Sequence, residues 1–276
     1  MMKFKSAQAS IDVPDNVDIQ AALARCTHLA IGTHPDDVEL IGMHGIHACY
    51  ESDGQYFASV VVTDGAGSPR AGDFANVSDD EMVAIRKTEQ NAAAKLGRYG
   101  IQIQLAYPSS AVKSLDQDVI DDLSTIFKTI DANTIYLHNP LDRHHSHRAV
   151  LQCCMQALSL SGVKPNACYG VEVWRSLDFL PADLRVALAR DQHPELSEKL
   201  LSVFKSQIAG GKRYDLAFVG RGLANATFAQ SHQVDNAQSL SFAIDLQPLL
   251  TENQVDFASF IKELLDSTTK DCLQIT

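Results

Sequence analysis

The segment THLAIGTHPDDVEL, residues 27–40, decides the fold. Residues 27–33 form a short apolar run that predicts a buried strand. A histidine, a proline and two aspartates follow directly, where this strand ends. In open α/β sheets, ligands bind beyond the carboxyl ends of the strands. The segment therefore predicts an α/β sheet with a polar site after its first strand.

Strand and helix patterns alternate along the rest of the chain. Further strands are predicted over residues 56–63, 101–107, 134–138 and 169–174. Helices are predicted from a capping box at Ser78–Glu81 to Gly97, after His145, over 196–208 before Gly210, and from Thr251 onward. This order predicts a mostly parallel sheet with helices on both faces. We expect a core over residues 1–180 and a C-terminal α/β extension, residues 181–276, packed on it.

Composition excludes several classes of protein. The 276 residues include 23 Lys and Arg against 34 Asp and Glu, a net charge of −11 that argues against a nucleic-acid partner. No apolar run approaches the ~20 residues that span a bilayer. The N-terminus lacks the apolar region of a secretory signal, and none of the six cysteines form a CxxC pair. We therefore expect a cytoplasmic protein with reduced thiols.

The first polar cluster contains His34, Asp36 and Asp37. Adjacent aspartates must point in different directions, so one can bind a metal ion while the other faces the attacking water. The alternative is an aspartate-rich helix start, because aspartate is favoured there. That alternative explains one aspartate but not the preceding His-Pro.

A second cluster, HNPLDRHHSHR, spans residues 138–148 at the end of another predicted strand. His144 and His147 are three residues apart and can face the same way across one helical turn. Two histidines and one aspartate leave an open position for water, which is typical of catalytic zinc. His34 and His147 are 113 positions apart, unlike the ligands of a zinc finger.

Four motifs together carry a family resemblance. HPDDVEL, Thr63-Asp64-Gly65, Arg86-x-x-Glu89 and the later His-x-x-His-Arg-Ala-Val resemble the PIG-L (LmbE-like) deacetylases over residues 27–160. The resemblance implies a Rossmann-like fold. It also implies metal-dependent removal of an acetyl group from an N-acetylglucosamine-type substrate.

The resemblance assigns roles to five residues. It implies that His34, Asp37 and His147 bind the metal and that Asp36 is the general base. His144 would stabilise the oxyanion or protonate the leaving amine. Zn²⁺ is the expected cofactor, although such a ligand set also accepts other divalent ions.

The distal motif departs from the family's pattern. Relatives usually have His-Pro-Asp-His, whereas this chain has His144-His145-Ser146-His147. The missing aspartate normally orients the catalytic histidine. We expect Asp142, or another acidic residue that the fold brings close, to orient His144 instead, and His145 stays a competing candidate for the catalytic role.

Weaker signals suggest substrate contacts. Asp64 and Arg70 follow the second predicted strand and are candidates to contact sugar hydroxyls. Arg175 is a candidate to hold an anionic group of the substrate, whereas Trp174, the only tryptophan, is expected to pack in the core. Glu89 lies on an apolar helix face and is expected to pair with Arg86.

These observations predict a metal-dependent hydrolase that deacetylates an N-acetylglucosamine-type amino sugar or its conjugate. One alternative is hydrolysis of a different N-acyl amide in the same site. Another is a catalytically silent member that binds sugar or metal. We expect a small-molecule partner, no nucleic acid and no membrane span, and leave open a homo-oligomer.

Overall fold

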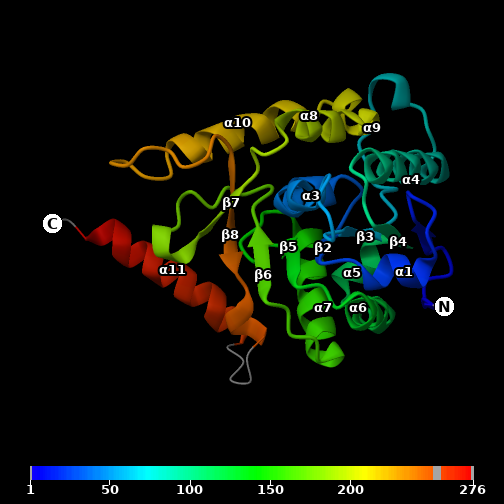
Figure 1. Ribbon diagram of the computed structural model, residues 1–276, viewed down its shortest axis with the longest axis horizontal. Helices are drawn as coiled ribbons and strands as arrows, with labels where there is room; N and C mark the ends of the chain where they lie inside the picture. The colour runs from blue at the N-terminus through cyan, green and yellow to red at the C-terminus, as the bar shows by residue number, and fades with distance from the viewer. Residues whose placement is uncertain (1, 251–255, 275–276) are drawn as a thin grey trace.

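The structure is a computed structural model that describes residues 2–250 and 256–274 (Figure 1). Its strands are β1 (Ser10–Asp12), β2 (His28–Gly32), β3 (Phe57–Thr63), β4 (Ile101–Tyr107), β5 (Thr134–His138), β6 (Ala167–Val171), β7 (Val186–Ala189) and β8 (Leu240–Asp245). Its first helices are α1 (Ile19–Ala24), α2 (Asp37–Ile41), α3 (Met43–Cys49), α4 (Asp79–Leu96), α5 (Ser109–Lys113) and α6 (Gln117–Ile130). The later helices are α7 (His145–Ser161), α8 (Pro194–Ser202), α9 (Lys205–Ala209), α10 (Tyr214–Thr227) and α11 (Phe257–Leu273).

The described strands form one eight-stranded sheet in the order β1-β4-β3-β2-β5-β6-β8-β7. The five strands from β4 to β6 in this order are parallel, and each corresponds to a predicted strand. The edge strand β1 is antiparallel to β4, and β8 is antiparallel to both β6 and β7. The expected α/β fold with a mostly parallel sheet is confirmed, although β1, β7 and β8 were not predicted.

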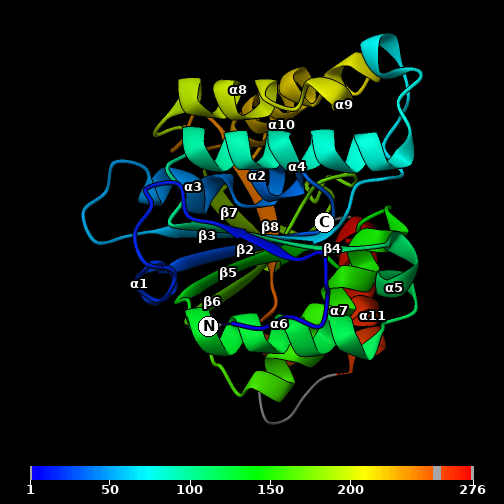
Figure 2. The same cartoon turned by 90° about the vertical axis from the view of Figure 1, so that its right-hand side faces the viewer.

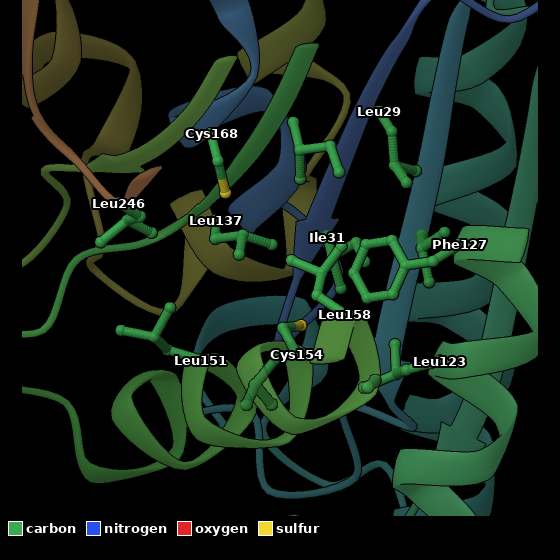
Figure 3. Close-up of a cluster of buried hydrophobic side chains, with 14 of the residues drawn as sticks. Leu29, Ile31, Leu123, Phe127, Leu137, Leu151, Cys154, Leu158, Cys168 and Leu246 are labelled. Carbon is green, nitrogen blue, oxygen red and sulfur yellow. The ribbon is translucent and has the colours of Figure 1, made fainter. Parts of the chain in front are cut away.

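Helices cover both faces of the sheet (Figure 2). On one face, Leu29 and Ile31 of β2 contribute to a core with Phe127 of α6 and Leu158 of α7 (Figure 3). The residue between them, Ala30, belongs to a second core under α2, α3, α4 and α8. Successive side chains of a strand point to opposite faces, so an uninterrupted apolar run serves both layers.

The C-terminal segment completes the sheet. Because β8 lies between β6 and β7, residues after 180 extend the sheet that the core begins. Phe260 and Leu264 of α11 join the core on the α6–α7 face. That this segment does not fold alone stays a prediction.

Two of the predicted helices lie in the C-terminal segment, over residues 196–208 and from Thr251 onward. The single helix predicted over 196–208 is wrong: α8 and α9 are separate, because Phe204 leaves the helical conformation with φ −80° and ψ 62°. The predicted start of the last helix at Thr251 lies outside the described residues, and α11 is capped by the Asp256 side chain. The capping box of α4 at Ser78 and Glu81 is confirmed.

Among the described helices, none is both long and apolar enough to cross a membrane.

Candidate metal centre and catalytic cleft

The predicted site residues gather where β2 and β5 end side by side. The chain runs from β2 outward through β3 to β4, then returns to place β5 on the other side of β2. This reversal of strand order is the point at which open α/β sheets bind ligands. The turn after β2 and the loop after β5 carry the two polar clusters.

The turn between β2 and α2 is tight, and side chains of α4 form hydrogen bonds with its backbone. A Cβ atom on Gly32 would lie 2.9 Å from both Asp37 Cβ and Val38 N, so glycine allows the chain to fold back here. Asp36 has φ 97°, a left-handed conformation that is uncommon for a residue other than glycine. Its backbone N–H donates to Gln90 Oε1 at 3.0 Å. Arg86 of α4 donates to the Pro35 carbonyl.

Three predicted ligands converge on one point. Asp37 Oδ2 lies 3.0 Å from His34 Nδ1 and 3.2 Å from His147 Nε2. One donor atom from each of these residues lies within 4.8 Å of the other two. Two imidazoles and one carboxylate match the three-ligand set of catalytic zinc sites.

The protonation chemistry of His147 also fits a cation. Its side chain is fully buried, and neither ring nitrogen makes a hydrogen bond within the described residues. Burial lowers its pKa, but the carboxylates of Asp37 and Asp142 outweigh burial and raise the pKa to about 9. The carboxylates that favour the protonated His147 ring would also favour a metal ion bound beside that ring.

Asp142 faces His147 and not the ring of His144. Its Oδ2 lies 3.4 Å from His147 Nδ1, and its Oδ1 accepts the backbone N–H of His144 at 2.7 Å. The Nδ1 atom of His144 is buried and has no hydrogen-bond partner within the described residues. Our expectation that Asp142 orients His144 is therefore wrong, because the loop path turns this carboxylate toward the buried ring of His147.

His144 lies at the junction of α7 and the cleft. It is the N-terminal cap residue of α7, and its ring centroid is 5.0 Å from that of His34 and 4.5 Å from that of His147. Burial and the neighbouring histidines lower its pKa to about 4. The competing candidate, His145, is exposed on the first turn of α7.

Asp36 points away from the ligand set. Its Oδ2 pairs with Arg86 Nη2 at 2.9 Å, and Arg86 also contacts Glu89 at 3.2 Å, as predicted for Glu89. Burial raises the pKa of Asp36 well above its ordinary value, against the opposing effect of Arg86. The two adjacent aspartates thus point in different directions, and both line the same cleft.

His138 is a site residue without a predicted role. It is buried at the end of β5, its ring stacks on His147 with centroids 3.8 Å apart, and its Nε2 accepts the Thr33 N–H at 3.1 Å. With Asp142 and His147 it forms a second set of converging donors. Its position as the last residue of a predicted strand was the signal in the sequence.

The three suggested substrate contacts lie elsewhere. Asp64 accepts the Ala66 N–H at 3.0 Å within its own turn. Arg70 pairs with Asp79 at 2.7 Å and also donates to carbonyls of its own loop. Arg175 is exposed. None of the three lines the cleft within the described residues, and their contact with a substrate stays a prediction.

The loop after β6 and the C-terminal segment together supply the other wall of the cleft. The cleft has a volume of about 460 Å³, and this wall comprises Trp174 from that loop and Gln207, Lys212 and Tyr214 from the C-terminal segment. Trp174 is half-buried and faces the cleft, so the expectation of core packing is wrong. Lys212 Nζ lies 4.9 Å from the Trp174 ring, and Tyr214 packs edge-on against that ring. The lone tryptophan and the basic turn at 210–215 were the available signals.

Comparison with known proteins places the chain in a family. The model of the family described as PIG-L, GlcNAc-PI de-N-acetylase, matches residues 29–158. The uncharacterized deacetylase YaiS of Escherichia coli (strain K12) is 31% identical over 150 residues, which cover 52% of this chain and 75% of that protein.

Two solved structures share the fold. N,N'-diacetylchitobiose deacetylase from Pyrococcus horikoshii matches with a TM-score of 0.66 and 16% identity, over 86% of this chain and 90% of that chain. The 4-carboxy-2-hydroxymuconate hydratase GalB from Pseudomonas putida KT2440 matches with a TM-score of 0.61 and 16% identity, over 84% and 100%. The fold thus accompanies more than one chemistry. By the family match and the relationship to YaiS, this chain belongs to the PIG-L (LmbE-like) deacetylase family.

Proposed function

We propose that this protein is a zinc-dependent N-deacetylase that removes the acetyl group from an N-acetylglucosamine-type amino sugar or its conjugate. The observation that carries the proposal is the opening of His34, Asp37, Asp36 and His144 onto one cleft. This arrangement combines a cation site, a carboxylate outside the ligand set and an imidazole. Amide hydrolysis needs all three of these functions.

His34, Asp37 and His147 would hold the metal ion. A divalent ion bound there supplies Lewis acidity, which polarises the acetyl carbonyl and lowers the pKa of water to ~7. Asp142 fixes the ring of His147 from behind, because its carboxylate faces the Nδ1 atom at 3.4 Å. Such an outer carboxylate sets the tautomer and orientation of a ligating histidine.

Asp36 is the proposed general base. Arg86 holds one of its carboxylate oxygens, so the group cannot rotate into the ligand set beside it. Asp36 has a left-handed conformation and pairs with Arg86, so its side chain lines the cleft but lies outside the ligand set that Asp37 joins. In this position Asp36 takes a proton from the attacking water and holds it for the departing amine.

His144 is the proposed partner of the tetrahedral intermediate. Its ring adjoins those of His34 and His147 and borders the cleft. A neutral imidazole in this position can donate one N–H to the developing oxyanion. Burial and the rings of His147 and His34 lower the pKa of His144 to about 4, against the opposing charges of Asp37 and Asp142, which favours the neutral imidazole.

Assay of acetate release tests the proposal. The zinc-loaded protein is incubated with N-acetylglucosamine, N,N'-diacetylchitobiose and a matched N-propionylglucosamine, and acid release is measured alongside free amine. Acetate and amine in equal amounts, with faster release from the acetylated sugars, support the proposal. Faster release of propionate favours the alternative acyl amide. Stoichiometric metal with no amine formed from any compound favours a silent binding protein.

A further inference from the structure

A second cavity lies beside the cleft of the proposed active site, and its lining includes residues of α10 and β8 and the residue that follows β7. Its volume is about 200 Å³, and Trp174 and Tyr214 line both spaces. We propose that this cavity is an anion-binding subsite that receives a carboxylate group carried by the substrate. The inference rests on the proposed function, since it narrows the substrate to an N-acetyl amino sugar conjugate that bears an acid.

Arg190 is the centre of the subsite. It directly follows β7, is 3% exposed and lines the cavity. Its guanidinium lies 3.5 Å from the centroid of the Phe218 ring, and its Nη2 donates to the Phe218 carbonyl. The Nε and Nη1 atoms are buried without a hydrogen-bond partner in the described part of the chain. A buried donor without an acceptor costs free energy. A ligand in the cavity would supply acceptors for these two donors.

Gly222 makes room for this guanidinium. A Cβ atom on Gly222 would lie 1.9 Å from Arg190 Nη2 and 2.2 Å from Ser239 Oγ. Gly222 lies inside α10, where glycine is less favourable than alanine by about 1 kcal/mol. The helix thus carries an unfavourable residue at the position where a larger one would displace Arg190.

The charges around the cavity favour an anion. Arg221 supplies a second guanidinium, whereas Glu172 is the single carboxylate among the lining residues. Glu172 is already engaged, because it accepts the backbone N–H groups of Leu177 and Phe242 and the amide of Asn225. Burial lowers the pKa of Arg190 to about 9, which still leaves it protonated at neutral pH. The lining side chains therefore carry two positive charges and one negative charge in a chain of net charge −11.

The remaining walls indicate the shape of the ligand. Leu40, Val173, Ala217 and Phe218 give the cavity an apolar surface. A carboxylate on a short hydrocarbon arm suits these walls better than a fully hydrated polyanion. The Trp174 ring centroid is 6.0 Å from that of His144, so the arm would run along Trp174 from the reacting amide.

Trp174 fluorescence provides a binding test that needs no turnover, because it is the only tryptophan. Metal-loaded protein is titrated with butyrate and with butyramide, which has the same shape but no charge. We expect butyrate to bind roughly tenfold more tightly or better, the value of a hydrogen bond to a charged group. Arg190→Met should abolish this preference. Any butyrate bound at the metal contributes equally to both proteins.

Arg185→Met is the matched control. Arg185 also lies over an aromatic ring, that of Phe242, but it does not line this cavity. This variant should keep the wild-type preference for butyrate. Gly222→Ala tests the same site without removing a charge and should weaken butyrate binding by displacing the guanidinium. Undiminished preference in both Arg190→Met and Gly222→Ala overturns the subsite.

Kinetics then connect the subsite to the substrate. N-acetylglucosamine glycosides with a carboxymethyl or carboxypropyl aglycone are compared with their neutral amides. In the wild type, at least one acid should show a KM roughly tenfold lower than its amide, and Arg190→Met should remove the difference. Equal KM values for every acid and amide overturn the proposal, even with efficient acetate release. An Arg190-dependent butyrate preference without acetate release would instead contradict the proposed function and leave an anion site of another reaction.

Discussion

At the residue scale, two adjacent carboxylates have different surroundings. Asp37 lies between two histidine rings, whereas Asp36 is paired with Arg86. The φ of 97° at Asp36 separates them, because it directs consecutive side chains to different sides of the turn. The proposed division into ligand and base rests on this backbone conformation.

Asp36→Asn should keep the metal and the fold but lose turnover by roughly 10²–10⁴-fold, the contribution of a positioned general base. The amide has nearly the same shape and can still contact Arg86, but it cannot accept a proton. Steady-state acetate release at saturating zinc measures the loss, with metal content determined in parallel. Asp116→Asn is the control, since Asp116 is exposed, does not line the cleft, and its side chain accepts only the Asp118 N–H among the described contacts. Near-wild-type turnover in Asp36→Asn would remove it from the reaction.

Asp142→Asn should weaken metal binding by about 10–100-fold, the usual effect of losing a carboxylate behind a ligating histidine. The reason is its position 3.4 Å from His147 Nδ1. Zinc affinity is measured by competition with a chelator. If affinity is unchanged and the pH–rate profile shifts instead, Asp142 acts on His144, as its sequence position first suggested.

The convergence of the two polar clusters was predictable because both follow the ends of strands in one parallel sheet. The family resemblance then singled out His34, Asp37 and His147 as the proposed ligands, and the structure brings these three residues together. The direction of Asp142 was not predictable in this way. It depends on the loop after β5, where the Asn139 side chain and carbonyl accept the N–H groups of Leu141 and Asp142.

At the element scale, α4 connects the turn after β2 to the C-terminal helices. Its Arg86 contacts Pro35 and Asp36, and its Glu89 accepts the N–H and hydroxyl of Ser206 in α9. The capping box predicted where α4 begins. The break between α8 and α9 was not predicted, because the apolar periodicity continues through Phe204. The hydrogen bond that the start of α9 makes, from Ser206 N–H to Glu89, joins residues 117 positions apart.

Ser206→Ala should lower the free energy of unfolding by about 1–2 kcal/mol, because it leaves buried Glu89 and Arg86 without a shared hydroxyl partner. Urea denaturation measures the change. Ser202→Ala is the matched control: its exposed hydroxyl bonds only to Lys199 among the described contacts, so we expect a change within about 0.5 kcal/mol. Equal stability of the two variants would show that the buried network contributes little.

At the scale of the whole molecule, residues far apart in the sequence share one sheet and one cleft. The parallel strands were predictable from local patterns, since β2, β3 and β5 are mostly apolar runs and β4 alternates between apolar and polar residues. Strands β7 and β8 were not, because their pairing depends on a partner about fifty residues away. The cleft wall formed by Trp174, Lys212 and Tyr214 depends on the same long-range packing.

Acid should destabilise the protein through His47, which joins α3 to α8 by a 2.9 Å hydrogen bond to Ser197. Burial lowers the pKa of His47 to about 4. In the unfolded chain this pKa is ~6.5, so protons favour the unfolded state as the pH falls from ~6.5 toward about 4. The wild type should lose about 2 kcal/mol by pH 5 relative to His47→Gln. Urea denaturation of both proteins at pH 7.5, 6 and 5 measures the difference, and parallel pH profiles would exclude His47 as the cause.

His34, Asp37 and His147 are proposed to hold one catalytic metal ion, and the proposed chemistry depends on it. Elemental analysis of the purified, zinc-equilibrated wild type, His147→Ala and His145→Ala proteins tests it most directly. We predict about one ion per chain in the wild type and in His145→Ala, since three ligands and water complete a single tetrahedral site. His147→Ala should lose the ion while remaining folded. Undiminished metal in His147→Ala would contradict the ligand assignment and the chemistry built on it.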